Sequence, residues 1–193
     1  MSARPTLRLA QDDHADALLS RDPFALVVGM LLDQQIPMEW AFTGPATIAE
    51  RIGADSLDPA TVAGYDPDEF VRIMSGPPAV HRYPKSMGAR VQKLAAYVAD
   101  QYGGDVSRLW TEAASGAELS RRLGQLPGYG DQKARIFVAL LGKQLGVRPD
   151  GWREAAGAYG DEGARRSVAD VVDADSLAEV RAYKREVKKA AKA

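Results

Sequence analysis

Two helical patterns joined by a short glycine turn limit the folds that this sequence can adopt. The turn lies in the segment 126–134, which reads Leu-Pro-Gly-Tyr-Gly-Asp-Gln-Lys-Ala. Before it, the residues 115–118 read Ser-Gly-Ala-Glu, a capping box that opens a short helix. After it, apolar residues recur at helical spacing over 136–145. The sequence therefore predicts two helices joined by a tight turn that contains Gly128 and Gly130.

This turn has the composition of an anion-binding loop. Gly128 and Gly130 allow positive φ angles and let the backbone come close to a ligand. Backbone N–H groups at the start of the second helix would then face outward, where they can bind an anion such as a DNA phosphate. Helix, Pro-Gly-x-Gly and helix is the pattern of a helix-hairpin-helix motif. It indicates a polymeric phosphate ligand rather than a metabolite.

The rest of the chain carries helix signals and few strand signals, which predicts an all-α fold. Three Asp-Pro steps, at 22–23, 58–59 and 66–67, each place an N-cap residue before a proline suited to the first helical position. The residues 24–32 are strongly apolar and predict a core helix. The longest amphipathic pattern covers 86–102 and stops at two glycines, a common helix end.

Composition excludes several classes of chemistry. The 193 residues include no cysteine, which excludes disulfides, thiolate metal sites and a cysteine-ligated iron–sulfur cluster. Only two histidines occur, so no histidine-rich metal centre is expected. No apolar run has membrane-spanning length and no signal peptide is evident, so we expect a cytoplasmic protein. Because the net charge is −1, any DNA affinity requires a local positive potential.

Three landmarks in order resemble the helix-hairpin-helix (HhH-GPD) superfamily of base-excision DNA glycosylases. They are Asp-Pro-Phe at 22–24 followed by Leu-Leu-Asp-Gln-Gln at 31–35, then Gly-Ala-Arg-Val-Gln-Lys at 88–93, then the hairpin. The resemblance extends over roughly residues 22–152. It implies hydrolysis of the N-glycosidic bond of a damaged or mispaired base in double-stranded DNA, after that base is flipped out of the helix.

The resemblance also implies how the fold is divided. We expect two helical lobes with the active site in the cleft between them. The first lobe would comprise 24–137 and contain the hairpin, and the second would comprise 1–23 together with 138–193.

The family pattern implies two catalytic positions. Gln132 occupies the place of the lysine that bifunctional members use, and the family's aspartate, eighteen positions later, would be Asp150. A carboxylate there would stabilise the positive charge that builds on the sugar, or orient a water. Since a glutamine amide cannot form a Schiff base, the resemblance implies a monofunctional enzyme. The alternative for Asp150, which lies in an Arg-Pro-Asp-Gly stretch, is an ordinary turn residue.

Other family positions imply contacts to DNA and to the flipped base. Trp152 would line the base pocket. No cofactor is expected, although the hairpin carbonyls of family members can hold a monovalent cation, and we expect a monomer. The residues expected to contact DNA are Gly128, Tyr129, Gly130, Lys133, Gln35 and Arg135.

Three alternatives remain open from the residues alone. Departures from the family pattern around Asp150 leave room for a non-catalytic DNA-binding protein on the same scaffold. Lys133, next to Gln132, leaves room for a bifunctional lyase. An unrelated all-α interaction domain is the third.

The surroundings of several aromatic and basic residues can also be predicted. We expect Tyr129 to be exposed at the hairpin tip, His81 to lie in a surface loop and Trp40 to belong to the core. The last helix, expected over 177–193, is rich in lysine and arginine, and we interpret it as a solvated surface helix.

Overall fold

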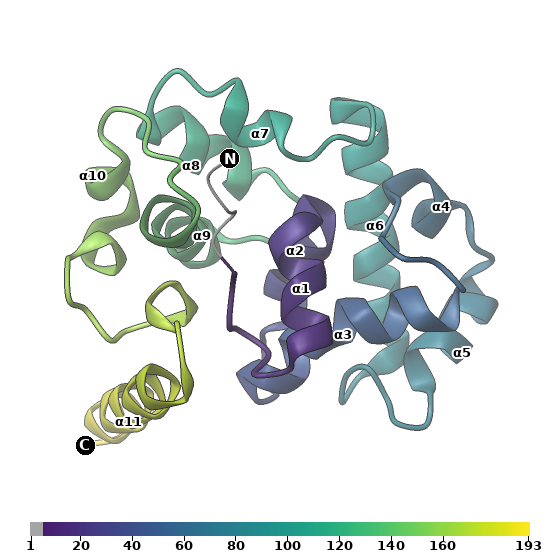
Figure 1. Ribbon diagram of the computed structural model, residues 1–193, viewed down its shortest axis with the longest axis horizontal. Helices are drawn as coiled ribbons and strands as arrows, with labels where there is room; N and C mark the ends of the chain where they lie inside the picture. The colour runs from purple at the N-terminus through teal and green to yellow at the C-terminus, as the bar shows by residue number, and fades with distance from the viewer. Residues whose placement is uncertain (1–5) are drawn as a thin grey trace.

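A computed structural model describes residues 6–193, and in this range the chain is helical without a strand (Figure 1). The all-α prediction is confirmed. The elements are α1 (Asp13–Arg21), α2 (Pro23–Leu32), α3 (Met38–Arg51), α4 (Pro59–Gly64), α5 (Pro67–Ser75), α6 (Pro84–Tyr102), α7 (Arg108–Thr111), α8 (Gly116–Gly124), α9 (Asp131–Gln144), α10 (Trp152–Ala156) and α11 (Ala174–Ala190), with two 3-10 helices, η1 (Gly157–Gly160) and η2 (Val168–Asp170).

All three Asp-Pro steps open helices, as predicted. Asp58 caps α4 and Asp66 caps α5 through their side chains, with proline at the first helical position. Asp22 does more than cap α2. One carboxylate oxygen accepts from the N–H groups of Phe24 and Ala25, and the other accepts from the Leu57 N–H at 2.7 Å. This buried carboxylate therefore ties the start of α2 to the segment before α4.

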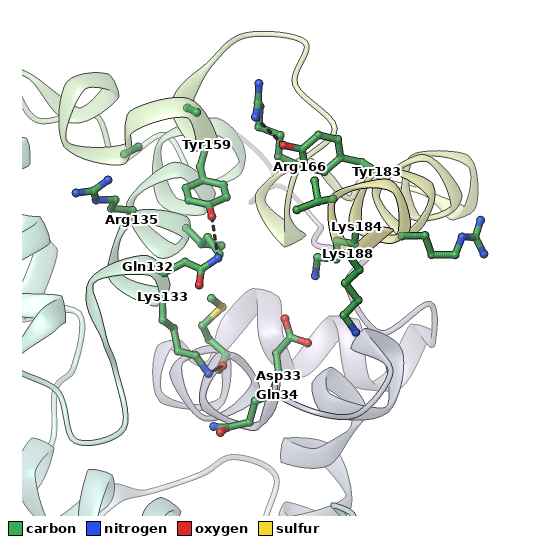
Figure 2. Close-up of a pocket in the computed structure, with 16 residues that line it drawn as sticks. Asp33, Gln34, Gln132, Lys133, Arg135, Tyr159, Arg166, Tyr183, Lys184 and Lys188 are labelled. Atoms are coloured by element: carbon green, nitrogen blue, oxygen red, sulfur yellow. Dashed lines mark hydrogen bonds between the residues drawn. The ribbon is translucent and has the colours of Figure 1, made fainter. Parts of the chain in front are cut away.

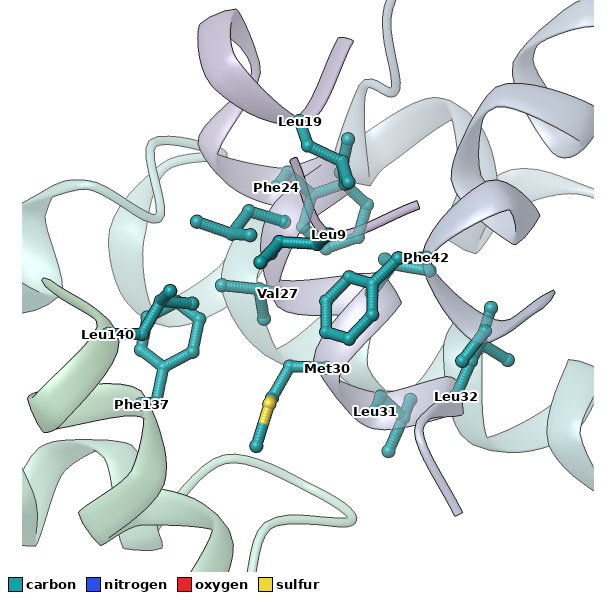
Figure 3. Packing of buried hydrophobic residues seen from close by; sticks show 14 of the residues in the cluster. Leu9, Leu19, Phe24, Val27, Met30, Leu31, Leu32, Phe42, Phe137 and Leu140 are labelled. Carbon is teal, nitrogen blue, oxygen red and sulfur yellow. The ribbon is translucent and has the colours of Figure 1, made fainter. Parts of the chain in front are cut away.

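Helix α2 is the centre of the hydrophobic core (Figure 3). Every residue from Phe24 to Leu32 is buried, which agrees with the continuous apolar run. Phe42 of α3 lies beside α2 at Gly29, where a Cβ atom would be only 2.7 Å from the Phe42 ring. Phe137 of α9 belongs to the same buried cluster. Because α2 is covered on all sides, its polar C-terminal end is the part that can take part in a site.

Three helix boundaries differ in detail from the sequence patterns. Helix α3 is continuous over Met38–Arg51 although Pro45 lies inside it, because its buried face packs against α1 and α2. Helix α6 ends at Gly103 in the left-handed conformation, as predicted, but it begins at Pro84, before the predicted start at 86. Helix α11 begins earlier than expected, because Asp173 caps it and forms a reciprocal capping box with Ser176.

The helices form neighbouring groups along the molecule (Figure 1). Helices α8, α9 and α10 pack together at one side and α4, α5 and α6 at the other, with α1, α2 and α3 between them. The predicted lobe boundary at residue 137 falls inside α9. The second lobe as predicted includes residues 1–5, which lie outside the described range, and the division stays a prediction. No helix formed by residues 6–193 combines the length and the apolarity needed to cross a membrane.

Candidate DNA-binding and active-site cavity

The hairpin joins α8 to α9 through residues 125–130, and its two glycines have different roles. Gly128 adopts a φ of +84°, and a Cβ atom there would lie 2.4 Å from the Leu31 side chain. Both its conformation and its contact with α2 therefore require glycine. Gly130 has an ordinary φ of −94°, and no atom beyond its chain neighbours lies within 4 Å of the Cβ position. Gly130 thus leaves open space on the outer face of the turn.

The start of α9 has the free N–H groups expected of an anion site. Gly130 is the N-cap of α9 and supplies no side-chain acceptor. Within residues 6–193, no acceptor is recorded for the backbone N–H groups of 131–133, and the first helical bond runs from Ala134 N–H to the Gly130 carbonyl. Arg135 pairs with Asp131 at 3.1 Å on the exposed face. These N–H groups can therefore hold a phosphate oxygen.

Tyr129 points inward, so the prediction that it is exposed is wrong. Its side chain is 6% exposed, and its hydroxyl donates to the Val27 carbonyl of α2 at 2.6 Å. The ring meets Phe137 edge-on, and burial raises the pKa of the Tyr129 phenol well above its ordinary value. The turn places Tyr129 between two exposed glycines, and its buried ring anchors the hairpin to the core. A direct DNA contact would require this ring to leave the core.

A cavity of about 680 Å³ opens beside the start of α9 (Figure 2). Its walls are the end of α2, the first turns of α9, η1 and one face of α11. Asp33 is the single carboxylate among its lining residues. Six of the other lining residues are basic, so the potential in the cavity is locally positive although the whole chain carries a net charge of −1. Its basic lining residues are Lys133, Arg135, Arg166, Lys184, Arg185 and Lys188.

Asp33 is the functional candidate that sequence reasoning missed. It is the C-cap of α2, and its half-buried carboxylate points into the cavity (Figure 2). Within residues 6–193, that carboxylate makes neither a hydrogen bond nor an ion pair within 4.0 Å. Burial raises the pKa of Asp33, and the charges of Lys184 and Lys133 partly offset the rise. The sequence feature that could have identified Asp33 is its place, as an acidic residue directly after a continuous apolar helix.

Lys133 faces the end of α2 rather than solvent. Its ammonium donates to the Met30 carbonyl at 2.7 Å and to the Leu31 carbonyl at 3.1 Å. These are terminal carbonyls of α2, which lack partners within the helix. Burial lowers the pKa of Lys133 to about 8, although the negative charge of Asp33 acts to raise it. The lysine therefore joins α9 to α2 at the edge of the cavity.

The shifted pKa of Lys133 predicts a pH dependence of stability. Its folded value of about 8 lies below the ordinary 10.5, so the unfolded chain binds this proton more tightly. Stability should therefore rise with pH through this window, by about 2 kcal/mol between roughly pH 7 and pH 10. Urea unfolding of wild type and Lys133→Met across this pH range isolates the effect. The contributions of the other titratable groups cancel in the difference between the two proteins. A difference between the two proteins that stays constant with pH would contradict the assignment.

The two glutamine positions have different surroundings. Gln132 lines the cavity, and its amide donates to the Tyr159 hydroxyl of η1 at 2.9 Å. Gln35 is exposed with a φ of +62°, a conformation uncommon for a residue other than glycine, and it is not among the lining residues. Its neighbour Gln34 does line the cavity, and its amide oxygen accepts from Arg90 at 3.2 Å.

Asp150 and Trp152 lie apart from this cavity. Asp150 is exposed in the turn before α10, and its backbone carbonyl accepts from the Gly116 N–H at 2.8 Å. The Trp152 ring is buried against Gly142, where a Cβ atom would be 2.3 Å from the ring. Trp152 borders a separate cavity of about 250 Å³. The structure thus brings Gln132, Lys133 and Arg135 into one cavity with Asp33. The predicted residues outside the lining of that cavity are Gln35, Gly128, Tyr129, Gly130, Asp150 and Trp152.

Two further predictions about single residues are wrong. His81 is fully buried, with its Nε2 atom 2.9 Å from the Gln34 carbonyl, and burial lowers the pKa of its imidazole. It supports the loop after α2 instead of lying on the surface. Trp40 is 37% exposed, and its indole N–H donates to the Ala79 carbonyl. Such an amphipathic ring can cover a loop while remaining partly in solvent.

Among residues 6–193, no group of three or more histidine, cysteine or acidic side chains is arranged to hold a metal ion. A monovalent cation at the hairpin carbonyls stays a prediction. Comparison of the chain with protein-family models, with curated proteins and with solved structures found no match.

Proposed function

We propose that this protein is a monofunctional DNA glycosylase, which hydrolyses the N-glycosidic bond of a flipped damaged or mispaired base in double-stranded DNA. The observation that carries the proposal is the basic cavity at the helix-hairpin-helix, with a single carboxylate inside it. The family resemblance of the sequence and this local chemistry agree on the same substrate class.

The charges of the cavity suit a polyanion. Six basic side chains line one opening, although the whole chain carries a net charge of −1. The outward N–H groups of α9 lie at the same end of that helix as Lys133, so a DNA strand held by the hairpin would pass the cavity mouth. We expect DNA affinity to fall steeply as the salt concentration rises, because bound phosphates release counterions.

The size and chemistry of the cavity suit a flipped nucleotide. A volume of about 680 Å³ lies within the range of roughly 300–1,000 Å³ that is usual for small-ligand sites. Breaking the glycosidic bond builds positive charge on the sugar, and a carboxylate held in the site stabilises that charge. The Gln132 amide is not a nucleophile, and the Lys133 ammonium is held by the Met30 carbonyl, which favours water as the attacking group.

Base release from defined duplexes tests the proposed function. Each duplex would carry one lesion from a panel of alkylated purines, uracil, hypoxanthine, oxidised guanine and mismatches, and heat with alkali would reveal abasic sites. Release from any of these supports the glycosylase and names its substrate. Silence across the panel with tight, salt-dependent binding of abasic DNA would instead favour a non-catalytic DNA-binding protein.

One observation favours a second activity, a lyase that uses Lys133. With a pKa of about 8, a fraction of this amine is neutral near neutral pH and could attack the sugar of an abasic site. Borohydride treatment of the protein on abasic DNA would then trap a covalent adduct that Lys133→Gln loses. If borohydride traps no adduct with wild type, the lyase activity is excluded and the proposal of a monofunctional enzyme stands.

Gly130→Ala is expected to weaken DNA binding by about tenfold while lowering stability by less than about 1 kcal/mol. The added methyl group meets no protein atom within 4 Å, so its effect falls on what approaches the turn from outside. Gly64→Ala at the end of α4 is the matched control, because its Cβ position is equally open. Fluorescence anisotropy with a labelled duplex measures the affinity. Unchanged affinity in Gly130→Ala would mean that no phosphate binds at the hairpin.

A further inference from the structure

We propose that Asp33, at the end of α2, is the catalytic carboxylate that faces the positive charge on the flipped nucleotide. The inference rests on the proposed glycosylase function and concerns which residue serves it. The family pattern assigned this role to Asp150, and the geometry of the cavity points to Asp33 instead.

The position of Asp33 combines rigid backbone with a free carboxylate. Its backbone N–H donates to the Gly29 carbonyl at 3.1 Å, which continues the hydrogen bonding of the buried helix α2. The carboxylate itself has no hydrogen bond or ion pair within residues 6–193. The backbone of Asp33 is therefore fixed at the end of α2, while its carboxylate oxygens are free to face a positive charge on a bound sugar.

The charged neighbours of Asp33 keep it available. Lys133 of α9 is held by the α2 carbonyls, and Lys184 of α11 lies across the cavity (Figure 2). Glu39 of α3 is the other acidic group close enough to affect Asp33, and it forms an ion pair with Arg181. The lysines supply positive potential without pairing directly with Asp33. A water or a cationic sugar can therefore reach its oxygens.

Asp150 has neither a position at the end of a buried helix nor a place in the basic cavity. Its side chain is exposed, and its turn is attached through the backbone to the start of α8, next to Trp152. It borders neither the cavity nor its basic residues. Each of its surroundings suits the turn role that the Asp-Gly pattern favours.

The reaction balances with water as the only other reactant. The bond between C1′ and the base nitrogen breaks, and its electron pair leaves with the base. Asp33 stabilises the resulting positive charge and accepts a proton from water as the water oxygen bonds to C1′. The proton that Asp33 takes from water passes to the departing base, directly or through solvent, which regenerates the carboxylate, so the products are the free base and an abasic site.

A pair of abasic duplexes tests the charge role without knowledge of the lesion. One duplex carries a neutral tetrahydrofuran at a single site, and the other carries a pyrrolidine, whose ring nitrogen is protonated and imitates the charge of the transition state. Wild type should bind the cationic duplex about tenfold more tightly or better, because a nearby carboxylate attracts it. Asp33→Asn should lose this preference, and Asp150→Asn should keep it.

The neutral duplex serves as the internal control. Asp33→Asn should bind it at least as tightly as wild type does, because the change removes a negative charge from a basic cavity. That result also shows that the variant is folded. Asp33→Glu, which keeps the charge, should retain part of the preference.

Failure of the inference and failure of the proposed function look different. If wild type releases a base from the lesion panel, and Asp33→Asn keeps both that activity and the charge preference, Asp33 is not the catalytic carboxylate while the glycosylase stands. Loss of activity and preference in Asp150→Asn alone would return the role to Asp150. A wild type that neither releases any base nor binds either abasic duplex overturns the proposed function, and the inference with it.

Discussion

Replacing Asp170 by alanine is expected to lower the free energy of unfolding by about 3–5 kcal/mol. Asp170 is almost fully buried in η2, where one carboxylate oxygen accepts from the Lys143 ammonium at 2.6 Å. The other accepts from the N–H groups of Arg166 and Ser167. The alanine variant leaves a half-buried ammonium and two N–H groups without their acceptor, which is the costly case for such a pair.

An exposed ion pair is the control for this prediction. Arg108 at the start of α7 and Glu112 at its C-cap form an ion pair with 2.7 Å between Nε and Oε1, and nearly half of each side chain is exposed. Glu112→Ala should therefore change stability by less than about 1 kcal/mol. Urea unfolding measures both variants. A loss of under about 1 kcal/mol in Asp170→Ala would show that solvent reaches the Lys143 site on substitution.

Loss of Asp170 should also affect the cavity. Its carboxylate accepts from the backbone N–H of Arg166, whose guanidinium donates to the Tyr183 hydroxyl of α11 at 2.7 Å. Helix α11 packs on η2, so the buried pair supports the wall that carries Lys184 and Lys188. DNA affinity of Asp170→Ala should therefore fall under conditions where the variant is still folded.

Tyr129→Ala is expected to destabilise the protein by about 3–5 kcal/mol, the usual cost of truncating a buried aromatic ring. The ring fills the space between α2 and Phe137, and its loss would leave a cavity under the hairpin. Tyr129→Phe keeps that volume and removes only the hydrogen bond to Val27, so about 1 kcal/mol should be lost.

The two Tyr129 variants separate a core residue from a DNA contact. Thermal unfolding gives the stability of each, and anisotropy below the unfolding transition gives the DNA affinity. A surface residue that stacks on DNA would show the opposite pattern, with stability retained and affinity lost in the alanine variant. That pattern would contradict the buried position of the ring.

Local chemistry made the secondary structure predictable. Asp22, Asp58 and Asp66 each cap a helix because an aspartate before a proline satisfies N–H groups within the next three residues. Gly103 ends α6 for a similar local reason, its left-handed backbone. The continuous apolar run of α2 predicted burial on every face. Such signals need no knowledge of distant segments.

Features that depend on a neighbouring helix could not be predicted in this way. A proline inside a helix usually breaks or kinks it, but tertiary packing keeps α3 continuous through Pro45. The glycines predicted the tight turn of the hairpin. Whether the Tyr129 side chain faces the core or the solvent depended on the space left by α2. The sequence predicted His81 to lie in a surface loop, whereas the folded chain buries its side chain completely.

The sequence by itself thus determined the all-α class, the helix starts at the three Asp-Pro steps and the hairpin, because each follows from interactions within a few residues. Only the tertiary structure decided which charged groups share a cavity. Lys133 reaches a carbonyl 103 residues earlier in the chain, and Asp33 faces lysines of α11 that lie still farther along it. Family spacing led to Asp150, a position counted along one segment. The potential around a carboxylate arises from all segments that surround it in space, so Asp33 became a candidate only after the chain had folded.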